Sequence, residues 1–371
     1  MTRPTLGATA LACFSLLLLG GQAFAKSPQA HQPGRHVLEG SEVTIHNLAG
    51  EMRIVEGTGN SVVVEIQTGG TDGDRLTVER RTDTKGRPVL WVVYPENRIV
   101  YDKYGFGPPS RHSNSRSSLD YNGHRVTVTS RGTGLDAHAD IRILVPRGKT
   151  VHAHCAVGPA YITNVEGEIS FEGASSTVQA ERVSGSLAVD LGSGDVAISR
   201  SSALISADTG SGNIMLTEVD GNIAADAGSG DIQMKRIGSE KISIDAGSGS
   251  ITGSDIRATT ISADCGSGEI DLDGTTVGTM ALSAGSGSVH LRLTKNIERL
   301  AIEAGSGSVK LEAPGNLSAR FRIECPRRNL HIDFPTAIDR GDDDLTEGTI
   351  GSGRGTIHIE AGSGSVDLVK M

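Results

Sequence analysis

Apolar and polar residues alternate with a period of two on both sides of a Gly-Ser-Gly triplet that recurs through the second half of the chain. Apolar residues stand five and three positions before the triplet, as in Ile205/Ala207, Ile223/Ala225, Ile242/Ile244 and Leu300/Ile302. The alternation resumes four and six positions after its first glycine, as in Ile214/Leu216, Ile232/Met234, Ile270/Leu272 and Val309/Leu311. This period is typical of β-strands with one buried face. Each unit is therefore predicted to be a strand, a Gly-Ser-Gly turn, a second strand and a second turn, which often carries one apolar residue such as Val219, Ile237 or Ile256.

The spacing of the triplet predicts how these units are arranged. It occurs nine times, and its first seven copies begin 18, 18, 19, 19, 19 and 20 residues apart, from Gly192 to Gly305. A unit this short cannot bury its own apolar face, whereas stacked units pair their backbones and align equivalent side chains in rows. The predicted fold is all-β: a β-solenoid of roughly ten two-strand coils of 18–20 residues with an N-terminal β-sheet cap.

The pattern divides the chain into four segments. Residues 1–25 are predicted to be a signal peptide, residues 26–35 a flexible mature N-terminus, residues 36–150 an N-terminal β region, and residues 151–371 the solenoid repeat domain. The N-terminal region alternates in the manner of strands, for example at Val62/Val64/Ile66. Because Val43 to Ile54 and Ile141 to Gly148 also resemble coils, a continuous array with a large insertion is a second interpretation.

The repeat becomes irregular near the C-terminus. Phe321, Ile323 and Cys325 keep its phase, with Pro326 in the place of the first turn glycine. Gly351 and Gly362 are only 11 residues apart, which is too close for two full coils, so one of them is predicted to belong to a terminal hairpin. An acidic run between Pro326 and Gly351 is predicted to be a solvated insertion loop; it contains Asp339, Asp342, Asp343, Asp344 and Glu347.

Composition and charge limit the location and the partners. Arg3, an apolar stretch from Leu6 to Leu19 and the triplet Ala23-Phe24-Ala25 are typical of a secretory signal peptide. No later apolar segment is long enough to span a membrane, so we expect an exported chain with no transmembrane segment, in the periplasm, at the cell envelope or surface, or secreted. The net charge is −9 over 371 residues, or −10 once Arg3 is removed with the leader, which argues against nucleic acid as a partner.

Several of these motifs resemble those of a known family. They are the segments Val43-Thr44-Ile45-His46-Asn47, Gly50-Glu51-Met52-Arg53-Ile54 and Ile141-Arg142-Ile143-Leu144-Val145-Pro146-Arg147-Gly148, and turns such as Gly192-Ser193-Gly194-Asp195-Val196. In these the chain resembles exported bacterial adhesin-like proteins with a domain of unknown function, which are β-solenoids with a repeated Gly-Ser-Gly turn. The resemblance covers nearly all of the mature chain. It implies residence in the envelope or at the surface and a role in adhesion or envelope stress. It implies no agreed set of catalytic residues.

Rows of equivalent positions contain the polar candidates in the solenoid. An acid usually stands two residues before the turn, as in Asp190, Asp208, Asp226, Asp245, Asp264, Glu303, Glu324 and Glu360. We expect these acids to accept hydrogen bonds from their own turn amides; Ca²⁺ binding between coils is the alternative, and otherwise no cofactor is expected. Cys265 and Cys325 directly precede the turn, where small apolar residues are expected to pack. His152 and His154 share one strand face and offer too few ligands for zinc, so an exposed pair is expected.

A departure from the repeat at residues 91–131 is the main candidate site. The aromatic residues there are six of the ten that remain after removal of the leader, and the stretch from Arg98 to Arg131 has six basic residues against two acidic ones. Tyrosine and arginine on a loop favour recognition of a protein, a sugar ring or an anionic glycan. The predicted ligand-binding or partner-binding residues are Trp91, Tyr94, Tyr101, Tyr104, Phe106, Arg111, Arg116 and Tyr121. The alternative interpretation is that the aromatic residues cover the open end of the solenoid.

No motif predicts catalysis. The chain has no Gly-x-Ser-x-Gly elbow, no phosphate-binding loop and no His-Glu-x-x-His sequence. We therefore expect an exported, non-enzymatic, adhesin-like binding module of the cell envelope, with an envelope or surface glycan or protein as its partner. A periplasmic envelope-stress or scaffold protein is one alternative, and a glycan-active enzyme on a β-helix is a second.

Overall fold

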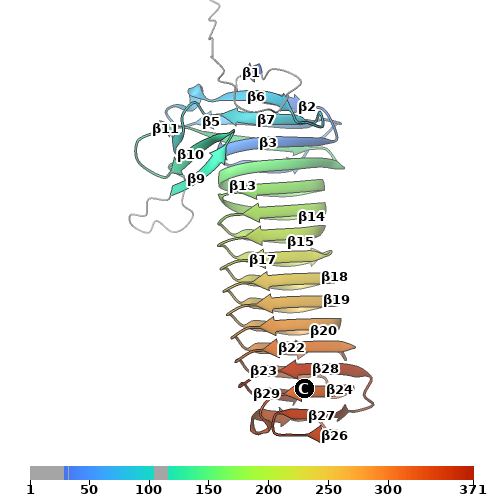
Figure 1. Cartoon of the computed structure of the whole chain (residues 1–371). Coiled ribbons are helices and arrows are strands. Elements are labelled where there is room, and N and C mark those ends of the chain that lie inside the picture. Colours follow the sequence, from blue (N-terminus) through green and yellow to red (C-terminus); the bar gives the residue numbers. More distant parts are fainter. Residues whose placement is uncertain (1–28, 32, 104–115) are drawn as a thin grey trace, which may run out of the picture.

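The chain is almost entirely β in the computed structural model, which describes residues 29–31, 33–103 and 116–371. Twenty-five strands form one continuous sheet and four form a smaller one. Two short 3₁₀ helices, η1 (Gly73–Arg75) and η2 (Arg327–Asn329), complete the elements of these residues (Figure 1). Within the described ranges, no helix has the length and apolar character needed to cross a membrane.

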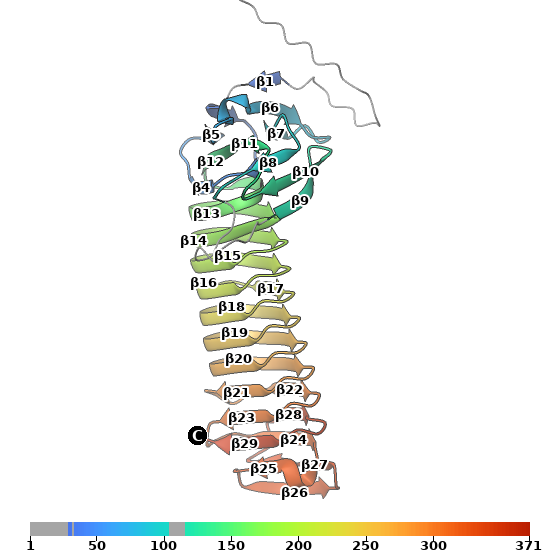
Figure 2. The same ribbon diagram turned by 90° about the vertical axis from the view of Figure 1, so that its left-hand side faces the viewer.

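The middle of the chain is a regular stack of parallel coils. Equivalent residues pair in register from coil to coil, so that Ile223 lies between Ile205 and Ile242. The two strand faces of each coil enclose a narrow apolar interior (Figure 2). The predicted all-β solenoid is confirmed. Its strands are β13 (Lys149–Gly173), β14 (Ser175–Leu191), β15 (Val196–Thr209), β16 (Ile214–Asp220), β17 (Ile223–Ala227), β18 (Ile232–Ala246), β19 (Ile251–Cys265), β20 (Ile270–Ala284), β21 (Val289–Leu293), β22 (Arg299–Ala304) and β23 (Val309–Ala313).

The second corner of most coils differs from the predicted turn, which is found between β21 and β22. In most coils the strand continues around this corner through a single residue with positive φ, such as Arg236 at 54° or Asp255 at 55°. The residue that follows this corner points inward and is buried, as Ile237 and Ile256 are. One left-handed residue therefore replaces a turn and lets strands such as β18 and β19 run from one face to the other. The conformation costs about 1–2 kcal/mol for a non-glycine residue, which the packing of the coil must offset.

The amides of the Gly-Ser-Gly turns do not donate to the acids that precede them, contrary to the prediction from the sequence. The acids that precede the turns, from Asp190 to Asp264, are exposed and accept no hydrogen bond from a described residue. Instead, the side chain of the residue just after most Gly-Ser-Gly triplets accepts the amide of its equivalent in the next coil. Asp195 accepts the Asn213 amide at 2.8 Å, and Asp231 accepts the Ser250 amide at 2.8 Å. The prediction for the preceding acids is wrong because their side chains point away from the turn, into solvent.

The cysteines pack as predicted. Cys265 lies in register between Ala246 and Ala284, and Cys325 occupies the equivalent place near the end of the stack. Both are buried, as is Cys155. Burial raises the pKa of the Cys265 and Cys325 thiols, and it raises the pKa of Cys155 to about 12. These thiols are therefore small apolar fillers of the interior.

The N-terminal strands continue the stack and then close it. β3 (Glu42–Ala49) and β4 (Met52–Glu56) pair in parallel with β13 and so form a coil of their own. β7 (Pro88–Val93) adds a further parallel strand beside β3, while antiparallel strands cover the end. The covering strands are β1 (Gln29–His31), β2 (Arg35–Leu38), β5 (Val62–Gly69) and β6 (Thr77–Thr82). β12 (His138–Val145) lies between β4, with which it is parallel, and β5, with which it is antiparallel.

A small sheet projects beside the N-terminal coils, as Figure 1 shows. It consists of β8 (Arg98–Val100), β9 (Arg116–Tyr121), β10 (His124–Thr129) and β11 (Leu135–Asp136). β9 and β10 are an antiparallel pair, and β10 also pairs in parallel with β8. The aromatic and basic segment of the sequence therefore contributes, in its described part, a sheet that stands beside the solenoid.

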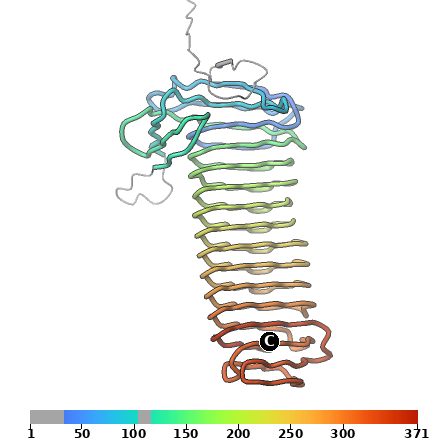
Figure 3. Tube along the Cα trace, viewed as in Figure 1, coloured from blue at the N-terminus to red at the C-terminus, as the bar shows by residue number. Residues whose placement is uncertain are grey.

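The C-terminal strands are stacked out of sequence order. β28 (Gly355–Glu360) pairs with β22 on one side and with β24 (Ala319–Glu324) on the other. β29 (Val366–Lys370) lies in the same way between β23 and β25 (Leu330–Ile332). The last strands of the chain are thus inserted between the regular coils and the segment that precedes them in sequence, at the lower end of the trace in Figure 3.

The acidic run at this end is not a loop. Asp339 lies in β26 (Thr336–Gly341) and Glu347 in β27 (Leu345–Ile350), which form an antiparallel hairpin. β27 pairs with β24 and covers the end of the stack, while Asp342, Asp343 and Asp344 lie in the hairpin turn. The prediction of a solvated insertion loop is wrong because the terminal coil needs a partner strand along its open edge.

Candidate binding groove

A column of three aromatic rings stands on the outer face of the N-terminal coils. Trp91 on β7, His46 on β3 and His154 on β13 occupy paired positions of neighbouring parallel strands. The Trp91 and His46 rings stack with centroids 3.8 Å apart, and the His46 and His154 rings stack at 4.3 Å. Parallel pairing places equivalent side chains one strand spacing apart, which suits flat rings.

The ring column leads directly into the row of acids. His154 Nδ1 lies 2.8 Å from the Glu172 carboxylate, and Glu172 pairs with Asp190 in the next coil. From Asp190 the row continues in register through Asp208, Asp226, Asp245 and Asp264. One face of the solenoid therefore carries rings at its N-terminal end and carboxylates along its length.

The stacked acids repel one another. Burial raises the pKa of Asp226, and the neighbouring Asp208 and Asp245 raise it further. A carboxyl group whose pKa is raised by folding opposes the folded state at neutral pH, and this cost disappears as the pH falls through the raised pKa. The row is therefore maintained against its own repulsion, by the packing of the coils beneath it.

A groove of about 500 Å³ lies where the ring column, the acid row and the projecting sheet meet. One side is formed by the rings, and the other by Leu119, Asp120 and Tyr121 of β9. Glu172 and Asp190 lie along its course. The groove therefore combines ring edges, apolar surface and carboxylates on elements held by the sheets.

The two imidazoles beside the groove are neutral. Burial lowers the pKa of His46 to about 3, with smaller contributions in the same direction from His154 and Arg81. Burial also lowers the pKa of His154, against the opposing effect of Glu172. The Arg81 guanidinium lies over the Trp91 ring, 5.3 Å from its centroid. The charge that faces a ligand in the groove therefore comes from the carboxylates.

Two tyrosines fasten the groove walls. Tyr121 donates to the Val92 carbonyl oxygen at 2.7 Å, and its ring meets Trp91 edge to face at 5.2 Å. The Tyr94 hydroxyl lies 2.9 Å from both Asn47 Oδ1 and the Ala49 carbonyl oxygen. Burial raises the pKa of both phenols. These hydroxyls are engaged with the protein and hold the sheet and the rings in place.

The predicted site residues are distributed over several environments. Trp91 and Tyr121 line the groove, Tyr94 packs behind it and Tyr101 is buried with 1% exposure. Arg116 is exposed at the start of β9, and Tyr104, Phe106 and Arg111 lie outside the described residues. The sequence reasoning missed His46, His154, Glu172 and Asp190 as groove residues. The signal available in the sequence was that these residues occupy equivalent positions in successive coils.

The predicted exposed histidine pair has partners. His152 Nε2 lies 2.9 Å from the Glu42 carboxylate, which also contacts Arg87. His154 stacks on His46 and pairs with Glu172. Both rings are partly buried. The expectation of an exposed pair is wrong because the coil of β3 lies against β13 and covers part of both side chains.

The fold defines an all-β solenoid protein. Residues 186–369 match the model of the Toastrack DUF4097 family. The matched range does not include the N-terminal segments on which the resemblance rests. Of the groove residues, it includes only Asp190. A search of curated proteins found no match.

One solved structure is similar over most of its length. It is the crystal structure of a candidate cell adhesion protein from Clostridium sporogenes, which is 10% identical, with 93% of this chain and 100% of that chain covered. The TM-score is 0.17, so the two structures do not superpose as wholes.

Proposed function

We propose that this protein is an exported, non-enzymatic binding module of the cell envelope that holds a glycan in the groove beside Trp91. The observation that carries the proposal is the meeting of stacked rings with the exposed carboxylates of Glu172 and Asp190 on a rigid support. Carboxylates accept hydrogen bonds from sugar hydroxyl or amino groups, and the side chain of Leu119 and the edge of the Trp91 ring offer apolar contact to the carbon skeleton of a sugar. The acidic lining disfavours an anionic glycan and favours a neutral or amino-bearing one.

The length of the solenoid suits this role. Coils about 4.8 Å apart form a rod in which each coil contacts only its neighbours. The groove lies near one end of this rod, beside the projecting sheet. A ligand held there is kept at a distance from whatever contacts the other end of the molecule. Such a spacer fits a role in adhesion.

Binding to a panel of neutral, amino-bearing and anionic glycans tests the proposed site. We expect Trp91→Ala and Asp190→Asn each to weaken binding by about tenfold, because one removes apolar contact and the other an acceptor for hydrogen bonds. Asp264→Asn is the matched control, since Asp264 occupies the same row outside the groove. Equal binding by all three variants and the native chain, or binding of a protein ligand alone, would contradict the proposal.

Protease treatment of intact cells tests the proposed location. If the chain is displayed at the surface, its immunoblot signal disappears while that of a periplasmic marker survives. Protection together with release by osmotic shock places the protein in the periplasm and directs the search toward envelope polysaccharides there. Recovery of the uncleaved chain in the cytosol alone would refute export.

A further inference from the structure

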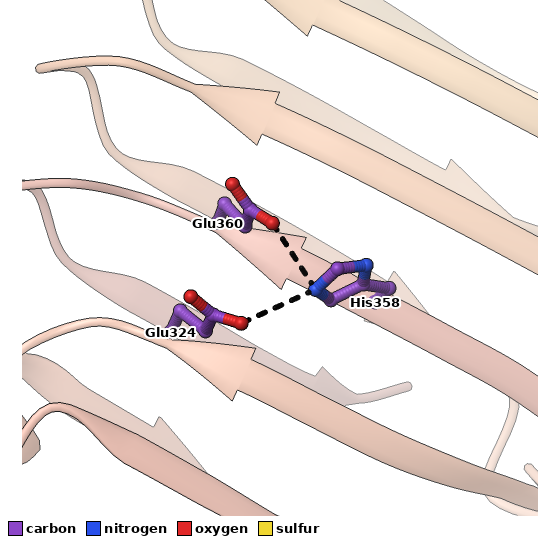
Figure 4. Close-up of side chains that lie close together, drawn as sticks. All are labelled: Glu324, His358 and Glu360. Carbon is purple, nitrogen blue, oxygen red and sulfur yellow. Dashed lines mark ion pairs between the residues drawn. The ribbon is translucent and has the colours of Figure 1, made fainter.

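A second cluster of polar side chains lies at the opposite end of the solenoid. His358 and Glu360 are on β28, and Glu324 ends the neighbouring strand β24. The strands are parallel and in register, so that Glu324 pairs with Glu360 and Arg322 pairs with His358. Figure 4 shows the imidazole directed toward both carboxylates. Strand pairing therefore brings together three side chains from segments more than thirty residues apart in sequence.

The three groups can meet at one ion. His358 Nε2 lies 3.3 Å from a Glu360 oxygen and 3.7 Å from a Glu324 oxygen, and all three atoms lie within 4.8 Å of one another. Tetrahedral zinc with bonds of about 2.0–2.2 Å keeps its ligand atoms about 3.3–3.5 Å apart. The distance from His358 Nε2 to Glu360 already falls in this range. The Glu324 oxygen reaches it after a side-chain movement of well under 1 Å.

The surroundings of His358 and Glu324 also suit a metal ion. His358 Nε2 is shielded from solvent and forms no hydrogen bond with any described residue. Arg322 donates to the Glu324 carboxylate at 2.8 Å. Glu324 is therefore oriented by a neighbour that is not itself a ligand, as metal-binding carboxylates commonly are.

Another histidine of the solenoid has two acidic neighbours but a different geometry. His290 Nδ1 lies 3.2 Å from Asp271, and its Nε2 lies 3.3 Å from Glu312. Because the two carboxylates face different ring nitrogens, they cannot converge with one nitrogen on a single ion. His290 is thus an acid-paired histidine without the proposed site, and it supplies a matched control.

We propose that Glu324, His358 and Glu360 bind one divalent transition-metal ion of the zinc type, with water in the remaining position. The imidazole ligand favours zinc and its neighbours in the periodic table over Ca²⁺ and Mg²⁺, which take oxygen ligands. The ion joins β28 to β24 and so links the last part of the chain to the segment that closes the stack. This site is independent of the groove near the other end.

Zinc titration of the purified chain without a histidine tag tests the site. We expect one Zn²⁺ per chain by calorimetry, with affinity at least about tenfold weaker in His358→Ala and in Glu360→Gln. His290→Ala retains the native affinity. Zn²⁺ raises the melting temperature of the native chain and of His290→Ala, because it binds only the folded form, but does not raise that of His358→Ala.

The melting temperature without metal shows whether the variants are folded. His358 and Glu360 are on the surface, so we expect metal-free His358→Ala and Glu360→Gln to melt with the native chain. Native zinc affinity in His358→Ala would overturn the proposal, as would the absence of zinc binding by the native chain. An equal loss in His290→Ala would also overturn it, since the ion would then be bound by scattered histidines.

Discussion

Gly249→Ala is expected to destabilise the solenoid by about 2–4 kcal/mol, which makes it one of the two most damaging single substitutions that we predict. Gly249 is the third residue of its Gly-Ser-Gly turn and packs directly on the turn of the coil before it. A Cβ atom there would overlap the carbonyl oxygen of Gly230, well inside van der Waals contact. Because the obstacle is backbone, the two coils must separate or the turn must change shape.

Ser248→Ala is the control in the same turn. Ser248 is exposed and makes no hydrogen bond within the described residues, so its change is expected to leave stability within about 0.5 kcal/mol. Urea unfolding followed by circular dichroism measures both variants. A Gly249→Ala chain as stable as the native one would show that the coils are less closely packed than this turn geometry requires.

Tyr121→Ala is expected to release the projecting sheet from the solenoid. The substitution removes a largely buried ring and its hydrogen bond to Val92, and we expect it to cost about 3–5 kcal/mol locally. Hydrogen exchange measures this directly, with faster exchange expected in β9 and β10 and unchanged protection in β18 and β19. Glycan binding is expected to fall as well, because Tyr121 forms one wall of the groove.

Tyr121→Phe separates the ring from the hydroxyl. It keeps the edge-to-face contact with Trp91 and removes only the hydroxyl, which donates to the carbonyl oxygens of Val92 at 2.7 Å and His46 at 3.2 Å, so a cost of about 1 kcal/mol is expected. Exchange in β9 is then expected to lie between that of the native chain and that of Tyr121→Ala. If the alanine variant leaves exchange in β9 and β10 unchanged, the sheet is held by other contacts.

The coil could be predicted from the sequence because its determinants are local. Alternating residues such as Ile242 and Ile244 specify a strand with one buried face, and glycine triplets at nearly constant spacing specify where it turns. The position of Cys265 among alanines indicated its burial for the same reason. The left-handed corner was missed because Arg236 and Asp255 carry no glycine signal, and the conformation is imposed by the coils on either side.

The groove could be predicted only in part. Trp91 and Tyr121 were visible as aromatic residues in a segment that departs from the repeat. His46 and His154 are 108 residues apart, and they stack only because β3 and β13 pair in parallel. No local pattern reports such a pairing, so the neutral imidazoles and their link to Glu172 became evident only in the folded chain.

The sequence by itself determined the shape of each coil, the rows of buried side chains and the row of acids, since these follow from spacing along the chain. The tertiary structure alone decided which coils are neighbours at the two ends. Every coil offers nearly the same paired edge, so β28 could have followed β24 in the stack instead of lying between β24 and β22. Pairing between similar edges is selected by packing over the whole end of the molecule. That selection brings Glu324 to His358 at one end and His46 to Trp91 at the other.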